Sequence, residues 1–164
     1  SLLGCVSKEG EPRVVISTNF GDMIFELSSE APLHKENFIK EIERGTWDDA
    51  SFNRLVKDFV IQAGCPDLED GTIEADHWID AEFSDQLTHE FGALGMGRDG
   101  NAEKKSANCQ FYIVTNKEGE HRLDGDYTIF GKLIEGEDVL LAINQLALAK
   151  NIDEVSFDIK VAED

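Results

Sequence analysis

Residues 110–115 read Gln-Phe-Tyr-Ile-Val-Thr and are the most strand-like stretch of the sequence. Aromatic and β-branched side chains pack well on a pleated, half-buried surface, so this run predicts a central β-strand. Shorter apolar runs lie before and after it, and the last of them alternates apolar and polar residues. With residues 110–115 they make about eight expected strands, the others being at 13–18, 23–27, 51–55, 59–63, 93–97, 128–133 and 155–161.

Two amphipathic helices are predicted between these strands. The first begins near Pro32, which suits a first helical turn, and ends at Gly45, while the second follows Gly136. Each has an apolar stripe at helical spacing, made by Phe38, Ile39 and Ile42 in the first and by Val139, Leu140, Ile143 and Leu146 in the second. Strands dominate and do not alternate with helices, which argues against a parallel α/β sheet. The sequence therefore predicts a mainly β fold, a closed eight-stranded antiparallel β-barrel capped by two α-helices.

The chain is strongly acidic, with 15 Lys and Arg residues, 34 Asp and Glu residues and a formal net charge of −19. Such a surface repels phosphate, so we expect no nucleic-acid partner, and acidic partners in general are disfavoured. The 164 residues fit one domain, and an apolar content of 41% is ordinary for a globular protein. No apolar run approaches the roughly 18 residues that a transmembrane helix needs.

The cysteines and histidines predict neither a disulfide framework nor a metal site. The three cysteines, Cys5, Cys65 and Cys109, form no C-x-x-C pair and are odd in number. No two Cys or His residues have zinc-finger spacing, and the four histidines are scattered singly, which is typical of surface residues. Residues 95–100 match G-x-G-x-x-G, but a polar loop follows instead of the helix that a dinucleotide site requires. We therefore expect no metal and no cofactor.

The N-terminal residues resemble the end of a bacterial lipoprotein signal, because Leu2-Leu3-Gly4 precedes Cys5. In such signals the cysteine after a small residue becomes lipid-modified. Residues 1–12 have two possible interpretations: they form a tether that anchors the protein through Cys5, or they are a remnant of cloning. Residues 13–164 then form the globular domain. The first reading places the protein in a bacterial cell envelope or periplasm as a lipoprotein, and the second leaves a cytoplasmic location open.

Four further segments stand out together. The first, residues 52–64, has the pattern F-x-R-x-x-x-x-F-x-x-Q-x-G, and the last, residues 123–132, has the pattern L-D-G-x-Y-x-x-F-G-K. Between them lie Gly-Ala-Leu-Gly-Met-Gly-Arg at 92–98 and Ser-Ala-Asn-Cys-Gln-Phe-Tyr-Ile at 106–113. In order and spacing, these segments resemble the cyclophilin family of peptidyl-prolyl cis-trans isomerases, and the resemblance extends over nearly the whole chain.

The resemblance implies an enzyme that accelerates rotation about X–Pro bonds in proline-containing polypeptides and so assists protein folding. Amide resonance holds this bond planar with a barrier of about 18–20 kcal/mol, and rotation breaks no covalent bond. Neither a nucleophile nor a metal or redox cofactor is therefore needed. A proline-binding module or chaperone of the same fold with little turnover is the alternative, and the retention of Arg54, Phe59 and Gln62 favours the enzyme. We expect a monomer.

By the same resemblance, the catalytic residues are Arg54, Gln62 and Phe59. Arg54 is the cation beside the prolyl amide, Gln62 holds the backbone on the acyl side, and Phe59 lines the proline pocket. The further substrate-binding residues are Val60, Arg98, Gln110, Tyr112, Leu123, Tyr127 and Arg122. Because Arg122 stands where many members carry Trp, we expect only weak binding of the cyclic peptide cyclosporin.

Overall fold

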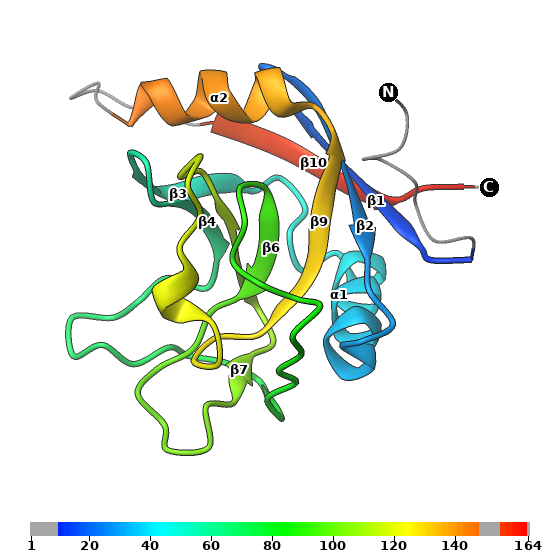
Figure 1. The fold of residues 1–164 in the computed structure, drawn as a ribbon. Coiled ribbons are helices and arrows are strands. Elements are labelled where there is room, and N and C mark those ends of the chain that lie inside the picture. Colours follow the sequence, from blue (N-terminus) through cyan, green and yellow to red (C-terminus); the bar gives the residue numbers. More distant parts are fainter. Residues whose placement is uncertain (1–9, 148–154, 164) are drawn as a thin grey trace.

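A computed structural model describes residues 10–147 and 155–163 of the chain. Eight strands form a closed barrel in which neighbouring strands run antiparallel (Figure 1). They are β1 (Arg13–Thr18), β2 (Gly21–Leu27), β3 (Ser51–Val56), β4 (Val60–Gly64), β6 (Ala93–Met96), β8 (Gln110–Val114), β9 (Ile129–Glu135) and β10 (Val155–Val161). Their order around the barrel is β1-β10-β3-β4-β8-β6-β9-β2. The predicted eight-stranded antiparallel barrel is confirmed.

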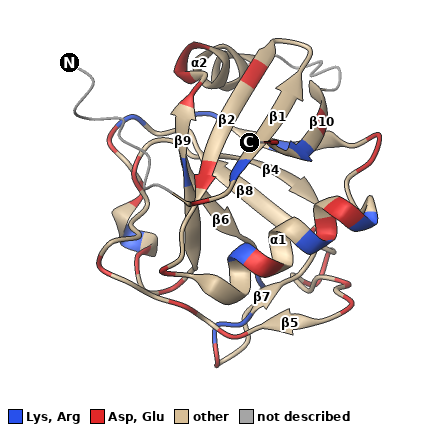
Figure 2. Ribbon diagram, turned by 90° about the vertical axis from the view of Figure 1, so that its right-hand side faces the viewer, with Lys and Arg blue, Asp and Glu red and all other residues tan. Residues whose placement is uncertain are grey.

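Two α-helices pack against this barrel, as predicted. α2 (Glu137–Leu146) lies above the barrel in Figure 1, and α1 (Pro32–Arg44) lies at its lower right. Phe38 of α1 is fully buried, and its ring lies 5.0 Å from the rings of both Trp47 and Phe130. Acidic and basic residues recur along α1 (Figure 2), and Glu36, Lys40 and Glu43 are exposed, as the amphipathic pattern predicts. Within the two described ranges, no helix has the length and apolar character needed to span a membrane.

Two short strands and one short helix were not predicted. β5 (Trp78–Ile79) and β7 (Ser106–Ala107) pair as a small separate sheet, and η2 (His121–Leu123) is a single 3₁₀ turn. The two strands lie in segments that the sequence predicts as irregular loops. A two-residue strand is too short to show an alternating pattern, so periodicity could not reveal it. The ends of the barrel strands differ from the predicted ends by at most two residues.

Alternation along β4 and β8 divides their side chains between the barrel core and the outer face. The core contains Ile61, Ala63, Phe111 and Ile113 from these strands. A second, outward apolar cluster contains Val60, Ala93, Tyr112, Val114 and Ile129. This second cluster lies on the face of the barrel that carries the candidate site.

The expectation of no disulfide is wrong, because Cys65 and Cys109 form a disulfide bond. β4 and β8 pair so that Gly64 lies opposite Gln110, and the next residue beyond each is a cysteine. This register brings the two cysteine Cα atoms within 5.5 Å, inside the range that a disulfide spans. An odd cysteine count did not exclude this single bridge. Cys5 lies outside the described residues.

The expectation that the histidines lie at the surface is wrong for His34 and His89, which are fully buried. Each side chain is held through both ring nitrogens. His34 Nδ1 lies 2.7 Å from Glu82 Oε1, and its Nε2 lies 2.8 Å from Ser106 Oγ. Polar partners at both nitrogens explain why a buried imidazole is tolerated here. The other two histidines are exposed, as expected.

Replacing both Cys65 and Cys109 with serine is expected to lower the free energy of unfolding by about 2–4 kcal/mol, the usual contribution of one disulfide. The bond restricts the unfolded chain, and that restriction is lost in the variant. Denaturant unfolding of the oxidised wild type and the variant measures the difference. A reductant should move the wild type to the midpoint of the variant and leave the variant unchanged. Equal midpoints for the two oxidised proteins would contradict this prediction.

Candidate active site

One hollow on the barrel brings together all ten residues that the sequence resemblance assigned to the site. Its volume is about 240 Å³. We call it the Arg54 pocket, and its lining residues are Arg54, Phe59, Val60, Gln62, Asp67, Gly97, Arg98, Gln110, Tyr112, Arg122, Leu123 and Tyr127. The sequence prediction missed Gly97 and Asp67. Gly97 belongs to one of the four segments that carry the resemblance, but Asp67 lies in an acidic loop with no distinguishing pattern.

Strand register creates the base of the Arg54 pocket. Arg54 on β3 pairs with Gln62 on β4, and Gln62 pairs in turn with Tyr112 on β8. On the other side of β8, Tyr112 pairs with Gly95 on β6. Residues paired in this way project from the same face of a sheet. Four positions distant in sequence thus form one row on the outer face, and a register shift of one residue would turn their side chains into the core.

Arg54, Gln62 and Phe59 form one contact group in the pocket. Arg54 Nη1 donates to Gln62 Oε1 over 3.5 Å, a long hydrogen bond. The guanidinium carbon of Arg54 lies 6.0 Å from the centre of the Phe59 ring, at the outer limit of a cation–π contact. Gln62 is buried, whereas Arg54 is exposed. Among the described residues, the other guanidinium N–H groups of Arg54 have no hydrogen-bond partner, so they can bind a ligand.

Apolar side chains make the walls next to Arg54. The Tyr112 and Tyr127 rings meet nearly edge to face with their centres 6.3 Å apart. Val60 and Tyr112 are almost fully buried, and Phe59 packs against the same outward cluster. Leu123 at the end of η2 adds a further apolar side chain to the lining. The pocket therefore combines a cation with a wall suited to a small apolar ring.

A chain of hydrogen bonds fixes the position of the Tyr112 hydroxyl. The Tyr112 hydroxyl oxygen lies 2.7 Å from His89 Nε2, and His89 Nδ1 lies 2.8 Å from Asp124 Oδ1. Asp124 also accepts a hydrogen bond from the His89 backbone N–H, and its Oδ2 lies 2.9 Å from His121 Nδ1. An ionised carboxylate can only accept, so His89 Nδ1 carries the proton and His89 Nε2 accepts from the Tyr112 hydroxyl. Sequence reasoning missed His89, because a lone histidine carries no pattern.

The surroundings of Tyr112, His89 and Asp124 favour the protonation states that these hydrogen bonds require. Burial lowers the pKa of His89 and raises the pKa of Tyr112 well above its usual value. Burial also acts to raise the pKa of Asp124, but hydrogen bonds from His121 and His89 outweigh it and the pKa is lowered. At neutral pH, His89 is therefore neutral, Tyr112 keeps its proton and Asp124 is ionised.

Two glycines allow polar and aromatic side chains to lie close against the backbone of β6 and the residue that follows it. A Cβ atom at Gly95 would lie 2.3 Å from Cζ of Tyr112, and one at Gly97 would lie 1.8 Å from Oε1 of Gln110. Gln110 Nε2 then donates to the Cys65 carbonyl oxygen at 2.7 Å and to Asp67 Oδ1 at 3.1 Å. Glycine at 95 and 97 is therefore required for the observed positions of Tyr112 and Gln110.

Two further arginines lie near aromatic rings of the pocket. The Arg98 guanidinium carbon lies 4.4 Å from the centre of the Tyr127 ring, and the corresponding carbon of Arg122 lies 5.2 Å from the centre of the Phe59 ring. Arg98 Nε donates to the backbone carbonyl of residue 126, and its Nη1 donates to that of residue 99. Arg122 Nε donates to Glu120 Oε2 over 3.2 Å.

Comparison with known proteins assigns this arrangement to a family. Residues 13–163 match the family model described as cyclophilin type peptidyl-prolyl cis-trans isomerase/CLD. The chain belongs to the cyclophilin family. Its curated relatives include a Staphylococcus epidermidis protein and a Staphylococcus aureus protein, each named as a peptidyl-prolyl cis-trans isomerase. Each is 32% identical to this chain, and the match covers 81% of this chain and 81% of the relative.

Solved cyclophilins have the same fold. The crystal structure of a Cryptosporidium parvum cyclophilin type peptidyl-prolyl cis-trans isomerase has a TM-score of 0.79 and 30% identity, covering 94% of this chain and 99% of that one. A second structure of that protein, obtained in the presence of the dipeptide Ala-Pro, has a TM-score of 0.78. The chain is accordingly a peptidyl-prolyl cis-trans isomerase that needs no cofactor, and the predicted family and activity are confirmed.

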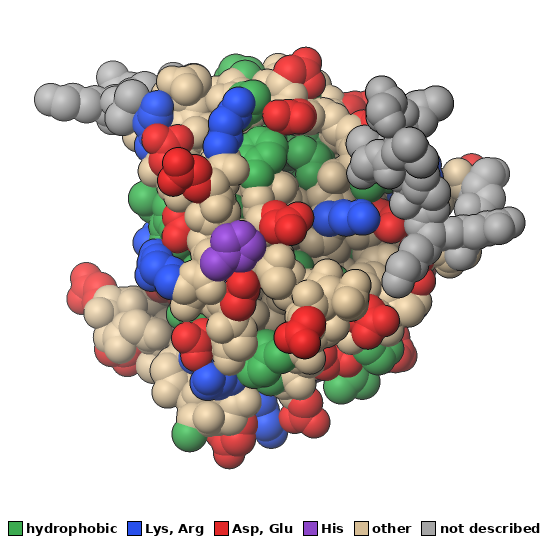
Figure 3. Space-filling model, viewed as in Figure 1, with side chains coloured by type: hydrophobic (Ala, Val, Ile, Leu, Met, Phe, Trp, Pro, Cys, Tyr) green, Lys and Arg blue, Asp and Glu red, His purple; other side chains and the backbone are tan. Residues whose placement is uncertain are grey.

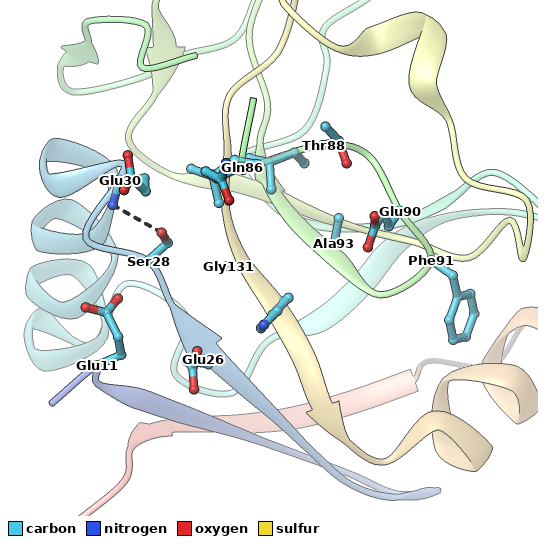
Figure 4. Close-up of a pocket in the computed structure, with 13 residues that line it drawn as sticks. Glu11, Glu26, Ser28, Glu30, Gln86, Thr88, Glu90, Phe91, Ala93 and Gly131 are labelled. Carbon is cyan, nitrogen blue, oxygen red and sulfur yellow. Dashed lines mark hydrogen bonds between the residues drawn. The ribbon is translucent and has the colours of Figure 1, made fainter. Parts of the chain in front are cut away.

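A second hollow of this cyclophilin, of about 170 Å³, shares no lining residue with the Arg54 pocket. Figure 4 shows its lining, which consists of Glu11, Glu26, Ser28, Glu30, Gln86, Leu87, Thr88, Glu90, Phe91, Ala93, Ile129, Gly131 and Lys132. Ser28 Oγ accepts a hydrogen bond from the Glu30 backbone N–H at 3.1 Å. Four of the lining side chains are glutamates, so this hollow does not suit an apolar proline ring.

Proposed function

We propose that the Arg54 pocket holds the proline ring of a polypeptide, and that Arg54 stabilises the amide as it twists. The row formed by Arg54, Gln62 and Tyr112 carries this proposal. It places a permanently charged donor, a polar amide and an aromatic wall beside one another in a single hollow. The reacting bond and the groups that hold it can therefore meet within one site.

In the proposed mechanism, the pocket binds the twisted amide better than the planar one. Twisting removes amide resonance, so the prolyl nitrogen becomes pyramidal and its lone pair can accept a hydrogen bond. A donor of Arg54 directed at this nitrogen stabilises the transition state more than the ground state, which lowers the barrier. Phe59 and Leu123 bury the ring, while Gln62 and the backbone near Arg98 hold the flanking chain so that only one side rotates.

An isomerisation assay on the purified protein tests this assignment. The cis-to-trans rate of an Ala-Pro tetrapeptide, followed by a protease that cleaves only the trans form, should rise in proportion to enzyme concentration. The Arg54 variants described in the Discussion then tie the activity to this pocket. Binding of the peptide without acceleration would support the alternative, a proline-binding module or chaperone with little turnover.

We also propose that the protein is located in a bacterial cell envelope or periplasm. We further propose that it is a monomer. The disulfide between Cys65 and Cys109 supports this location, because structural disulfides persist mainly in oxidising compartments. Intact mass spectrometry of natively expressed protein, with cell fractionation, tests both the location and a lipid on Cys5. Sedimentation equilibrium tests the monomer. Recovery from the cytoplasm with Cys65 and Cys109 as free thiols would contradict the proposed location.

The activity of each folded molecule is expected to stay constant from about pH 6 to pH 8, because the proposed chemistry uses a guanidinium group and no histidine, cysteine or carboxylate. Burial holds the pKa of Tyr112 well above this window, so its hydroxyl also keeps its proton. A pH–rate profile of kcat/KM measures this. A bell-shaped curve between these limits would indicate a titrating catalytic group that the mechanism lacks.

The free energy of unfolding, unlike the activity of each folded molecule, is expected to depend on pH and must be measured alongside activity. Burial lowers the pKa values of His34 and His89 in the folded protein, so below about pH 6.5 the unfolded chain binds more protons than the folded one. The free energy of unfolding therefore falls as the pH falls through this region. Each rate is divided by the folded fraction at the same pH.

A further inference from the structure

The Arg54 pocket is basic although the protein is strongly acidic. The chain contains only five arginines and carries a net charge of −19. Three of these arginines, Arg54, Arg98 and Arg122, line this one hollow. Among the described residues that line it, Asp67 is the one carboxylate, and it already accepts a hydrogen bond from Gln110. This concentration of positive charge exceeds what a single prolyl amide requires.

The three arginines differ in how far their donors are already used. Arg54 is assigned above to the amide itself. Arg98 donates through Nε and Nη1 to two backbone carbonyls and stacks on Tyr127, so its guanidinium is held in place. Arg122 uses Nε for Glu120, and its side chain is 67% exposed. Within the described part of the chain, Arg122 Nη1 and Nη2 have no hydrogen-bond partner, so both can reach a ligand.

We propose that this isomerase prefers prolyl segments with a carboxylate side chain next to the proline, and that Arg122 determines this preference. The inference rests on the proposed binding of proline in the Arg54 pocket. The Arg122 guanidinium lies 5.2 Å from the centre of the Phe59 ring, which is a wall of that pocket. A residue adjacent to the bound proline therefore passes within reach of Arg122. A planar guanidinium with two available N–H groups matches a carboxylate in geometry and charge.

The net charge of the whole protein does not remove this local attraction. Acidic side chains are spread over the face shown in Figure 3, but at physiological salt the Debye length is about 8 Å, so distant exposed carboxylates are screened. The acidic side chains on either side of Arg122 in the sequence already have partners: Glu120 accepts from Arg122 and Asn116, Asp124 lies against His89 and His121, and Asp126 pairs with Lys104 at 2.7 Å. At short range, the contact with Arg122 therefore outweighs the long-range repulsion.

The test compares glutamate with its neutral isostere glutamine on either side of proline. Four peptides are used: Ala-Glu-Pro-Ala against Ala-Gln-Pro-Ala, and Ala-Ala-Pro-Glu against Ala-Ala-Pro-Gln. NMR exchange spectroscopy at about 0.15 M salt measures kcat/KM without a coupling protease, whose own preferences would interfere. For the wild type, we expect the glutamate peptide to be favoured about two- to fivefold in at least one pair, the size of one exposed guanidinium–carboxylate contact.

Variants assign the preference to Arg122. In Arg122→Gln the ratio of glutamate to glutamine rates should fall to about one, and in Arg122→Lys, which keeps the charge without the planar fork, it should fall only in part. Lys160→Gln removes one positive charge from an exposed position on β10 and should keep the wild-type ratio. Each ratio compares two substrates of one protein sample, so a change in the amount of folded enzyme cancels.

The outcomes separate this inference from the assignment on which it rests. If the peptides are turned over but the wild-type ratio stays below about two in both pairs, the preference is overturned and the isomerase pocket is left intact. An unchanged ratio in Arg122→Gln, or an equal loss in Lys160→Gln, also overturns the role of Arg122. No acceleration of any of the four peptides by the wild type would overturn the proposed mechanism and the preference together.

Discussion

Replacing Arg54 with lysine or alanine is expected to lower kcat/KM at least tenfold while the barrel stays folded. Arg54 is exposed, and its guanidinium makes one long hydrogen bond and one distant ring contact, so the fold depends little on it. The transition state depends on it much more, because a planar fork of donors is lost in both variants and the charge is lost in alanine. Isomerisation rates and thermal unfolding curves of the same samples measure the two effects separately.

The matched control for Arg54→Lys is Arg44→Lys. Arg44 lies on α1, where it pairs with Glu41 at 3.1 Å and with Asp76 at 3.5 Å, and it lines no part of the Arg54 pocket. This variant makes the same chemical change away from the site, so wild-type activity is expected. Wild-type turnover by Arg54→Lys would contradict the proposed electrostatic role, because lysine keeps the charge but cannot reproduce the fork.

Cyclosporin is expected to inhibit the wild type only in the micromolar range, and Arg122→Trp should tighten the inhibition about 10–150-fold. Family members with Trp at this position bind the drug tightly, since an indole offers a flat apolar face and one N–H donor. Arg122 instead presents a hydrated cation that is held by Glu120 and is 67% exposed. One good hydrogen bond with its packing contributes about 1.5–3 kcal/mol, which corresponds to this range.

Titration of the drug against wild type and Arg122→Trp measures the effect, with kcat/KM for a neutral proline peptide determined for each protein. Lys160→Gln serves as the control that changes a surface charge away from the pocket. Tyr127 and Val60 differ from the residues usual in the family and line neighbouring parts of the same hollow, so we expect them to add to the loss of affinity. Nanomolar inhibition of the wild type, or no gain in Arg122→Trp, would show that position 122 does not control the drug.

The barrel could be predicted from the sequence because regular alternation marks its strands, and the resemblance to the cyclophilin pattern indicated ten residues that the fold brings into one hollow. Period-two alternation identifies strands such as 155–161, whose predicted ends agree with β10. The site residues follow from fixed spacings in four segments, and strand register turns those spacings into one row. Arg54 and Gln62, eight positions apart, become direct neighbours because β3 and β4 are joined by a short turn.

The features that the sequence did not reveal depend on contacts between distant segments. Cys65 and Cys109 meet only through the register of β4 with β8. His89 is buried because Asp124 and Tyr112, 35 and 23 residues away, supply partners for its two ring nitrogens. Asp67 enters the pocket through a loop with no periodic pattern, where the Gln110 side chain donates to it. None of these contacts has a local sequence signal.

The disulfide also changes what a single chain break would do to the molecule. Cys65 and Cys109 close a covalent ring that contains the irregular segment after β4 together with β5, β6 and β7. Cleavage of one peptide bond anywhere between residues 66 and 108 would open this ring without separating the two fragments. The strand that carries Gln62 and the strand that carries Gln110 and Tyr112 would stay joined through sulfur. Two walls of the pocket thus share a covalent link that does not pass through the intervening residues 66–108.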